Sequence, residues 1–384
     1  MFRIDTEYTL QTLVDLVRIN SVNPDLAEDG PGEAEIGAYT AEALRQLGLD
    51  VTVYDLGASR VNVVGVLKGK GNGRSLLLNA HMDTVGVAGM ADPFGAVVEN
   101  GRLYGRGAQD MKGSLAAMLG VTKALVDAGI ELGGDVLITA VADEEYASIG
   151  TDDLVKHITA DGAIVTEPTD MTLCRAHRGF TWFDVETFGR AAHGSRYQDG
   201  IDANMRMGHF LAELDKLEQA LRQRPPHPLA GPPSLHAALL QGGSAPSIYA
   251  DACRLRLERR SIPGETIAQM TAELQAIIDQ LSAADPTFRA AVKPYFGRDA
   301  FEVAAEAPVV QSLAAGITAV LNQPPVHTGA TFWTDAAILS AAGIDTALIG
   351  PSGGGLHSAE EWVEVQSVFD LAHILAETAV HFCR

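Results

Sequence analysis

Apolar runs that alternate with helix-like segments constrain the fold of this 384-residue chain more than any other feature. Four strand-like runs stand out, namely "SLLLNAH", "DVLITAVA", "GAIVTE" and "DTALIG". Segments such as "SLAAMLGVTKALVDAG" and "TDDLVKHI" separate the first three and are typical of helices. A β-α-β-α order indicates a sheet with helices packed on both faces. We therefore predict an α/β fold whose mixed sheet is covered by helices on both faces.

The pattern changes near Gly179, where "TWFDVETF" alternates as a half-exposed antiparallel strand does. A helix, a proline-rich connection, two strands, a helix and the strand "RAAVKPYF" follow. This β-α-β-β-α-β order is that of a ferredoxin-like unit. The α/β pattern then resumes, and a chain of this length favours two domains. We predict a main domain in two parts, 1–178 and 294–384, interrupted by an inserted α+β domain at 179–293.

Composition excludes several classes of function. The formal net charge is −21, which disfavours partners such as nucleic acid or an anionic membrane and leaves a small molecule as the expected partner. The N-terminal segment is typical of an amphipathic helix rather than a signal peptide, and no apolar run approaches the roughly 20 residues that span a bilayer. Three scattered cysteines form neither a disulfide framework nor a thiolate zinc site, so we expect a cytoplasmic protein.

Ionisable residues stand just past the predicted strands or before a helix. The set is His81, Asp83, Asp110, Glu144, Glu145, Glu167 and His357. In open α/β sheets ligands bind beyond the carboxyl ends of the strands. Two imidazoles with several carboxylates are ligand chemistry for Zn²⁺ or a similar ion, and these donors suffice for two ions if one carboxylate bridges. One residue of the Glu144–Glu145 pair could then bind metal while the other accepts a proton, and Asp83 could orient the His81 ring.

Two glycine-rich stretches each allow more than one interpretation. "KGKGNGR" is not followed by a helix start, so we predict a flexible hairpin turn rather than a phosphate loop. "GPSGGGLH" could be a flexible loop. Alternatively, the backbone N–H groups of Gly353, Gly354 and Gly355 could hold a substrate carboxylate next to His357.

Six ordered motifs resemble those of a known family. They are "HMDTV", "GRGAQDMKG", "ADEEYASIG", "VTEPT", "GRAAHGS" and "LHSAEEWVEV". The chain resembles the di-zinc metallopeptidases that include acetylornithine deacetylase, succinyl-diaminopimelate desuccinylase, carboxypeptidase G and aminoacylase. The resemblance runs from about residue 8 to the C-terminus and implies a zinc-exopeptidase-like fold.

The resemblance also implies roles for the strand-end residues. His81 and Glu167 match the ligands of the first metal. Glu145 and His357 match those of the second metal, and Asp110 matches the bridging carboxylate. The two divalent ions would be zinc, although cobalt and manganese also suit such ligands.

The remaining positions of the motifs match residues of the catalytic apparatus. Glu144 matches the general base and Asp83 the acid that orients the first-metal histidine. In this family the peptide bond after the bridging aspartate is typically cis, so we predict a cis Asp110–Met111 bond.

The inserted domain carries two further matches. From the residues alone, His193 is a turn histidine. In the family the matching histidine reaches the partner subunit's site and stabilises the oxyanion, which implies a homodimer through an insert that also acts as a lid. Arg260 matches an arginine before a P-G, where it could grip a substrate carboxylate or be a surface strand residue. Glu258 stands where the family often has Asp, and Ser247 where many members have Asn.

These matches predict metal-dependent hydrolysis of an amide next to a free carboxylate. Removal of an acyl group from an N-acyl amino acid is the leading hypothesis, because "ACRLRLERRSIPGE" and "GATFWTDAAIL" resemble the acetylornithine-deacetylase-related deacylases. A dipeptidase or carboxypeptidase using the same site is the alternative. A non-catalytic binding relative is a remote third, since every matched metal and base position is filled.

Overall fold

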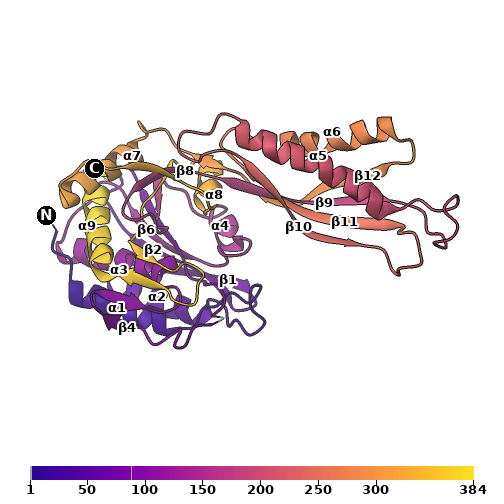
Figure 1. Cartoon of the computed structure of the whole chain (residues 1–384). Coiled ribbons are helices and arrows are strands. Elements are labelled where there is room, and N and C mark those ends of the chain that lie inside the picture. The colour runs from indigo at the N-terminus through magenta and orange to yellow at the C-terminus, as the bar shows by residue number, and fades with distance from the viewer. Residues whose placement is uncertain (1, 88) are drawn as a thin grey trace. The chain divides into compact units, whose positions relative to one another are not determined.

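The structure, a computed structural model, describes residues 2–87 and 89–384, and the chain divides into two compact units (Figure 1). Unit 1 comprises Met1–Arg175, Val303–Thr328 and Thr334–Arg384. Unit 2 comprises Ala176–Glu302 and Gly329–Trp333, so it extends beyond the predicted insert of 179–293 at both ends. Among the described residues no helix is both long and apolar enough to cross a membrane.

A mixed sheet whose strands lie mostly in unit 1 has the order β1-β2-β6-β3-β7-β15-β8-β13, with β14 paired to β8. Its strands are β1 (Asp50–Gly57), β2 (Arg60–Leu67), β3 (Leu76–His81), β6 (Val136–Val141), β7 (Gly162–Val165), β8 (Leu173–His177), β13 (Phe301–Glu302), β14 (His327–Ala330) and β15 (Thr346–Leu348). Strand β13 and the last residues of β8 and β14 fall within the bounds of unit 2. Strands β6, β3, β7 and β15 run parallel, and β1, β2, β8 and β13 are antiparallel to their neighbours. Every residue of β3, β6, β7 and β15 is buried, so both faces of this region are covered, as predicted.

Seven helices of unit 1 pack around this sheet in the part of the chain that the structure describes. They are α1 (Thr6–Arg18), α2 (Ala34–Gln46), α3 (Gly113–Asp127), α4 (Ile149–Leu154), α7 (Pro308–Leu321), α8 (Ala336–Ala341) and α9 (Val365–Phe382). The N-terminal amphipathic helix is confirmed, because α1 buries Leu13, Leu16 and Val17 and begins at an Asp5 cap. Helix α3 is buried along most of its length, except near Lys123 and Asp127, and contacts both α1 and α9.

The prediction of a hairpin at "KGKGNGR" is wrong. Strands β2 and β3 are not neighbours, because β6 lies between them and pairs antiparallel with β2 and parallel with β3. The connecting loop is held by the segment that leads into β6, since the N–H groups of Lys70 and Asn72 donate to the carbonyls of Leu132 and Gly133. The glycine-rich loop therefore crosses over the end of β6 to connect β2 with β3.

A second, small sheet of unit 1 was not predicted. It has the order β16-β17-β5-β4 and contains β4 (Val97–Glu99), β5 (Arg102–Tyr104), β16 (Gly353–Gly354) and β17 (Trp362–Glu364). Its strands have two or three residues each, which is too short for the sequence pattern to be recognised. The sheet joins the segment before Asp110 to the segment that contains His357.

Unit 2 has the predicted ferredoxin-like order. Its elements are β9 (Gly179–Phe188), α5 (Ala203–Gln223), β10 (Ser234–Gly242), β11 (Ala252–Ser261), α6 (Ile267–Ala284) and β12 (Arg289–Arg298). The strands form one antiparallel sheet in the order β10-β11-β9-β12, and both helices contact it. Thr266 and Gln269 form a capping box that begins α6.

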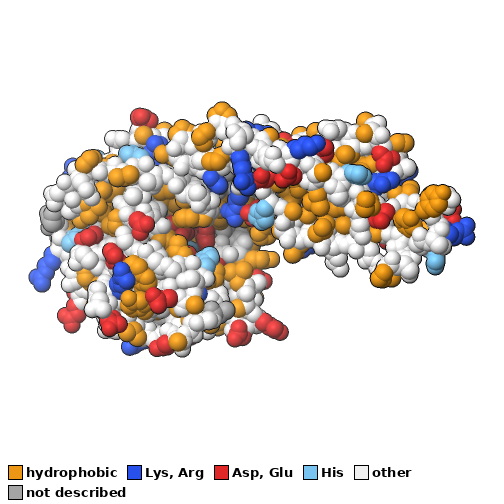
Figure 2. Space-filling view, viewed as in Figure 1, with side chains coloured by type: hydrophobic (Ala, Val, Ile, Leu, Met, Phe, Trp, Pro, Cys, Tyr) orange, Lys and Arg blue, Asp and Glu red, His pale blue; other side chains and the backbone are white. Residues whose placement is uncertain are grey.

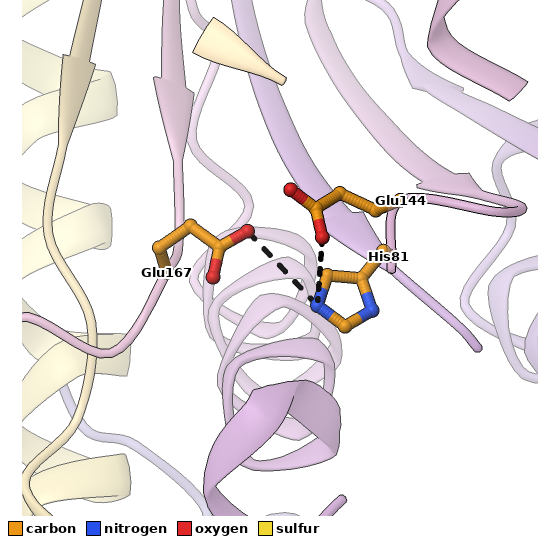
Figure 3. Close-up of side chains that lie close together, drawn as sticks. All are labelled: His81, Glu144 and Glu167. Atoms are coloured by element: carbon orange, nitrogen blue, oxygen red, sulfur yellow. Dashed lines mark ion pairs between the residues drawn. The ribbon is translucent and has the colours of Figure 1, made fainter. Parts of the chain in front are cut away.

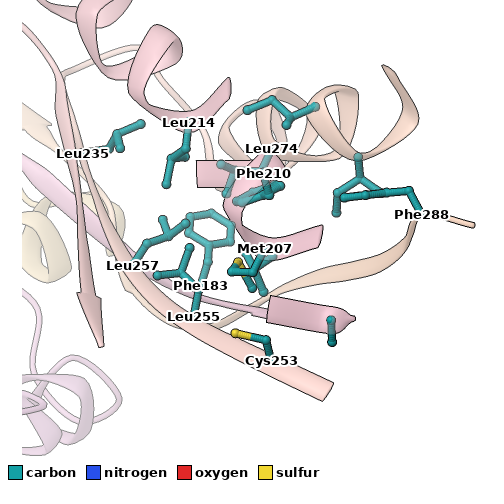
Figure 4. Close-up of a cluster of buried hydrophobic side chains, with 14 of the residues drawn as sticks. Phe183, Met207, Phe210, Leu214, Leu235, Cys253, Leu255, Leu257, Leu274 and Phe288 are labelled. Carbon is teal, nitrogen blue, oxygen red and sulfur yellow. The ribbon is translucent and has the colours of Figure 1, made fainter. Parts of the chain in front are cut away.

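The core of unit 2 lies between these helices and one face of its sheet (Figure 4). Leu255 and Leu257 on β11 alternate with exposed arginines, while Phe210 and Leu214 reach the same cluster from α5. The period of two on the strand and of three to four on the helix is the expected pattern for one buried face of each. The other face of the sheet carries charged pairs such as Arg256–Asp184.

Candidate metal centre

Parallel strands of unit 1 bring three predicted side chains together at their carboxyl ends (Figure 3). His81 is the last residue of β3, Glu144 follows β6, and Glu167 follows β7. The His81 Nε2 atom lies 4.0 Å from Glu144 Oε2 and 4.0 Å from Glu167 Oε1. One ligand atom from each of the three lies within 4.8 Å of the others, so the group could hold a metal ion.

Asp110 stands between the two histidines of the predicted set. Its Oδ1 lies 3.1 Å from His81 Nε2 and its Oδ2 lies 3.3 Å from His357 Nε2. Glu145 Oε2 lies 3.1 Å from the same His357 nitrogen. The carboxylate of Asp110 therefore offers one oxygen to each histidine. The Asp110–Met111 peptide bond is cis, which confirms that prediction.

Asp83 lies behind His81 and also contacts the loop that carries both glutamates. Its Oδ1 is 3.5 Å from His81 Nδ1, and its backbone carbonyl is 3.0 Å from the same nitrogen. The N–H groups of Glu144 and Glu145 donate to Oδ1 and Oδ2 at 3.1 and 3.2 Å. Oxygen atoms face both ring nitrogens, because the carboxylates of Asp110, Glu144 and Glu167 lie on the Nε2 side. Burial alone would lower the pKa of His81, but the hydrogen bond to Asp110 and the neighbouring negative charges raise it well above its usual range. A metal ion at Nε2 would require that nitrogen to be unprotonated, which would leave the proton on Nδ1, facing Asp83.

The charges of this cluster are unbalanced. Burial, and then the charge of Glu167, raises the pKa of Glu144 well above its usual range. Burial and the charge of Asp110 raise the pKa of Glu145 to about 7. Hydrogen bonds to Asp110 and Glu145 raise the pKa of His357 to about 10. The raised pKa values show that negative charges repel one another at this edge of the sheet. A divalent cation would relieve that repulsion, and carboxylates with imidazoles are suitable ligands for it.

One donor atom is also left without a partner. Glu167 Oε1 is buried and, among the described residues, has no hydrogen-bond partner. A buried carboxylate oxygen normally accepts a hydrogen bond or binds a metal ion. Together with His81 Nε2, which lies 4.0 Å from it, this oxygen fits a resident cation.

Residues that the sequence interpretation did not single out support these side chains. Glu361 is buried and accepts hydrogen bonds from the N–H groups of Gly107, Gln109 and Asp110, each at 3.0 Å. It lies four positions after His357 in "LHSAEE", and that spacing from a candidate ligand was the available signal. Asn23, which donates to Asp83 at 2.8 Å, gave no such signal because "SVNP" is remote in sequence.

Asp335 is a second buried acid that was overlooked. Its Oδ2 accepts a hydrogen bond from Thr151 Oγ1 at 2.6 Å. Burial raises its pKa to about 6. The motif "GATFWTDAAIL" contains Asp335, but nothing in that motif distinguishes it from a helix cap.

The substrate-binding and oxyanion candidates have different surroundings. His193 is an exposed residue of unit 2 whose Nδ1 lies 2.9 Å from Ser195 Oγ. Arg260 Nε donates to Glu258 Oε1 at 2.6 Å, and the guanidinium lies 5.3 Å from the centre of the Phe180 ring. Neither residue belongs to unit 1, which contains the cluster.

The glycines before His357 are more ordered than the flexible-loop interpretation implies. Gly353 and Gly354 form β16 and pair with β17. A Cβ atom on Gly353 would lie 2.3 Å from the Trp362 carbonyl oxygen, and one on Gly355 would lie 1.7 Å from that of Glu360. Close backbone approach therefore requires glycine at both positions.

Comparisons with known proteins agree with this geometry. Residues 77–381 match the peptidase family M20/M25/M40. Acetylornithine deacetylase from Myxococcus xanthus is 31% identical over 383 residues, which are 97% of this chain and 97% of that protein. N-formyl-4-amino-5-aminomethyl-2-methylpyrimidine deformylase from Bacillus subtilis is 30% identical over 386 residues, which are 91% of this chain and 89% of that protein.

A solved structure shows the same fold. The dinuclear metal-binding peptidase of the M20 family from Bacillus subtilis matches with a TM-score of 0.75 at 14% identity, covering 98% of this chain and 97% of that one. The predicted zinc-exopeptidase-like fold and the family resemblance of the motifs are both confirmed. The chain is a metal-dependent hydrolase of amide bonds and belongs to the M20/M25/M40 peptidase family.

Proposed function

We propose that this hydrolase removes the acyl group from an N-acyl amino acid with the help of two divalent metal ions. The observation that carries the proposal is the position of Asp110, with one carboxylate oxygen 3.1 Å from His81 and the other 3.3 Å from His357. His81 and Glu167 would hold the first ion, Glu145 and His357 the second, and Asp110 both. These nitrogen and oxygen donors suit zinc, and also cobalt or manganese.

The ions, when bound, supply Lewis-acid polarisation of the amide and a water of lowered pKa. Glu144 is the residue we assign as general base. Its carboxyl group is buried at the edge of the cluster, and its pKa is raised by burial and by Glu167. A carboxylate of raised pKa accepts a proton from the attacking water and can later donate it to the leaving amine nitrogen.

Asp83 keeps the His81 ring in one orientation and one tautomer. Its carboxylate and its backbone oxygen both face Nδ1, at 3.5 and 3.0 Å. Replacing residues that orient a metal-binding histidine in this way typically lowers metal affinity or activity by about 10–100-fold. We therefore assign Asp83 a positioning role rather than metal binding.

A free substrate carboxylate would be bound by a cationic side chain or by backbone N–H groups. The guanidinium of Arg260 can form paired hydrogen bonds with a carboxylate, although in this structure Glu258 occupies its Nε. Backbone N–H groups of Gly353, Gly354 and Gly355 are a second candidate site. His193 is proposed to stabilise the oxyanion, as its motif suggests.

We further propose a homodimer formed through unit 2. Strand β10 is an edge of its sheet, and its residues from His236 to Gly242 are exposed. Leu239 and Leu240 on this strand are 62% and 57% exposed, and Figure 2 shows hydrophobic side chains among charged ones on that part of unit 2. An exposed apolar edge strand is a template for pairing with another chain. We propose the cytoplasm as its compartment, because its three cysteines are scattered along the sequence without CxxC spacing.

Two experiments test the proposal together. Elemental analysis should find two metal ions per chain, and hydrolysis of N-acetylornithine should be lost on chelation and restored by Zn²⁺ or Co²⁺. Two ions with turnover only of dipeptides would favour the peptidase that is the second candidate. Absence of metal after reconstitution would refute the proposed centre.

A further inference from the structure

A buried amide connects the N-terminal loop of unit 1 to Asp83. Asn23 is fully buried, and its Nδ2 donates to Asp83 Oδ2 at 2.8 Å and to Asp143 Oδ1 at 2.9 Å. Two carboxylates that would otherwise repel each other thus share one NH₂ group. Asp83 in turn accepts the N–H groups of Glu144 and Glu145. Asp83 is therefore the single residue that connects Asn23 to His81 and to both glutamates of the candidate centre.

Arg60 prevents the Asn23 amide from turning over. This arginine is 3% exposed and donates to Asn23 Oδ1 at 2.8 Å, which leaves only the NH₂ group to face the carboxylates. The same guanidinium donates to Asp143 Oδ1 at 2.9 Å and to Glu33 Oε1 at 3.0 Å. One cation therefore fixes the amide and offsets the negative charge of Asp143, which shares the Asn23 NH₂ group.

The backbone around Asn23 is held beside the segment that follows β3. Ser21 Oγ donates to the Met82 carbonyl at 2.7 Å, and the N–H of Asn23 donates to the Thr84 carbonyl at 2.9 Å. Gly30 packs against this segment so closely that a Cβ atom there would lie 2.6 Å from Val22 O and 2.8 Å from Asn23 O. These contacts therefore fix the backbone from which the Asn23 side chain extends.

We propose that Asn23, held by Arg60, is a positioning residue for the metal centre. By fixing Asp83 Oδ2 it allows one carboxylate to orient His81 and, at the same time, to place the peptide units of Glu144 and Glu145. Orientation of a ligand and placement of the base are thereby coupled through a single side chain. This inference rests on the proposed function, because it assumes that His81 and Glu145 bind metal.

The test replaces Asn23 by leucine, which has a similar volume and no hydrogen-bonding groups. Metal-free protein is titrated with Co²⁺ and followed by its visible absorption, which reports affinity and coordination geometry without any turnover. We expect N23L to weaken Co²⁺ binding by about tenfold or more. We also expect kcat of the loaded enzyme to fall, with KM much less affected.

Phe382 on α9 provides a control at the opposite edge of the sheet. Its side chain is fully buried, and its ring lies against Gly162, the first residue of β7, rather than against the carboxyl ends of the strands. F382L should lower the melting temperature as N23L does, yet keep the wild-type Co²⁺ affinity. Equal losses of Co²⁺ affinity in the two variants would overturn the inference, because they would show a general effect of stability.

A second variant displaces Asn23 without changing its chemistry. The added methyl group of G30A should push the Val22–Asn23 backbone, so Co²⁺ affinity should fall in the same direction as in N23L. If wild-type protein binds two Co²⁺ ions and N23L has the same Co²⁺ affinity and kcat, the inference is overturned and the proposed function stands. Wild-type protein that binds no Co²⁺ would overturn the proposed function, and the inference with it.

Discussion

Substitution of Glu33 by glutamine should change how the stability of unit 1 depends on pH. Glu33 is fully buried at the start of α2, where its Oε1 accepts hydrogen bonds from Arg60 at 3.0 Å and from the N–H of Asp143 at 3.3 Å. Its Oε2 has no hydrogen-bond partner among the described residues. Burial and the charge of Asp83 outweigh the attraction of Arg60 and raise the pKa of Glu33 from 4.5 to about 8.

The sign and size of the effect follow from this pKa. Between pH 4.5 and pH 8 the folded state binds a proton that the unfolded state has released, so the free energy of unfolding falls as pH rises. The slope is about 1.4 kcal/mol per pH unit and flattens near pH 8. Glutamine keeps the Oε1 acceptor and does not ionise. Between pH 6 and pH 8, E33Q should therefore gain about 2 kcal/mol in unfolding free energy relative to wild type.

Urea unfolding at pH 6, 7 and 8 measures this difference, with metal-loaded wild type and E33Q compared at each pH. The exposed Glu35 on the same helix is the matched control, and E35Q should follow wild type at every pH. An infrared difference spectrum between wild type and E33Q at pH 7 should contain the band of a protonated carboxyl group. A difference in unfolding free energy that does not change with pH, together with no such band, would refute the reasoning.

Four further substitutions test other parts of the structure. E144A should lower kcat by about 10²-fold or more while two metal ions remain bound, and loss of metal would contradict its role as base. R260M should raise KM for a carboxylate-bearing substrate by about tenfold or more, with kcat changed less. L240E should convert a dimer to a monomer in sedimentation experiments; an unchanged dimer would place the interface elsewhere. F210A should destabilise unit 2 by about 3–5 kcal/mol in thermal unfolding, because this ring is fully buried.

Strand-end residues were the part of the centre that could be predicted from sequence. His81 ends β3 and Glu167 follows β7; both strands are fully buried, apolar and parallel, and such strands are recognisable and end at one edge of a sheet. The ferredoxin-like order was also predictable, since α5 and α6 have clear periodicity and turn residues mark their ends. The position of β6 between β2 and β3 was not, because loop length does not reveal whether another strand will enter the gap.

The supporting residues could not be predicted for a related reason. Asn23 meets Asp83 across 60 positions, and Glu361 meets Asp110 across 251. Neither residue lies in a periodic segment, and an isolated asparagine or glutamate is most often a surface residue. Only the tertiary structure shows that they are buried and what they contact. Asp110 and His357 were candidates because they stand before a helix and after the strand "DTALIG", but only the family resemblance supplied their roles.

The position of β15 in the sheet has a consequence for how the chain is synthesised. Strands β7 and β8 follow each other in sequence, yet β15, at Thr346–Leu348, lies between them. The four-stranded sheet of unit 2 is complete once Arg298 has emerged, whereas the central sheet of unit 1 keeps a gap until almost the whole chain is made. Domains generally fold as units during translation, so the inserted unit can fold while the surrounding unit is still incomplete. His357, which we propose as a ligand of the second metal ion, emerges after β15, so the proposed metal centre would be completed only in the last stage of synthesis.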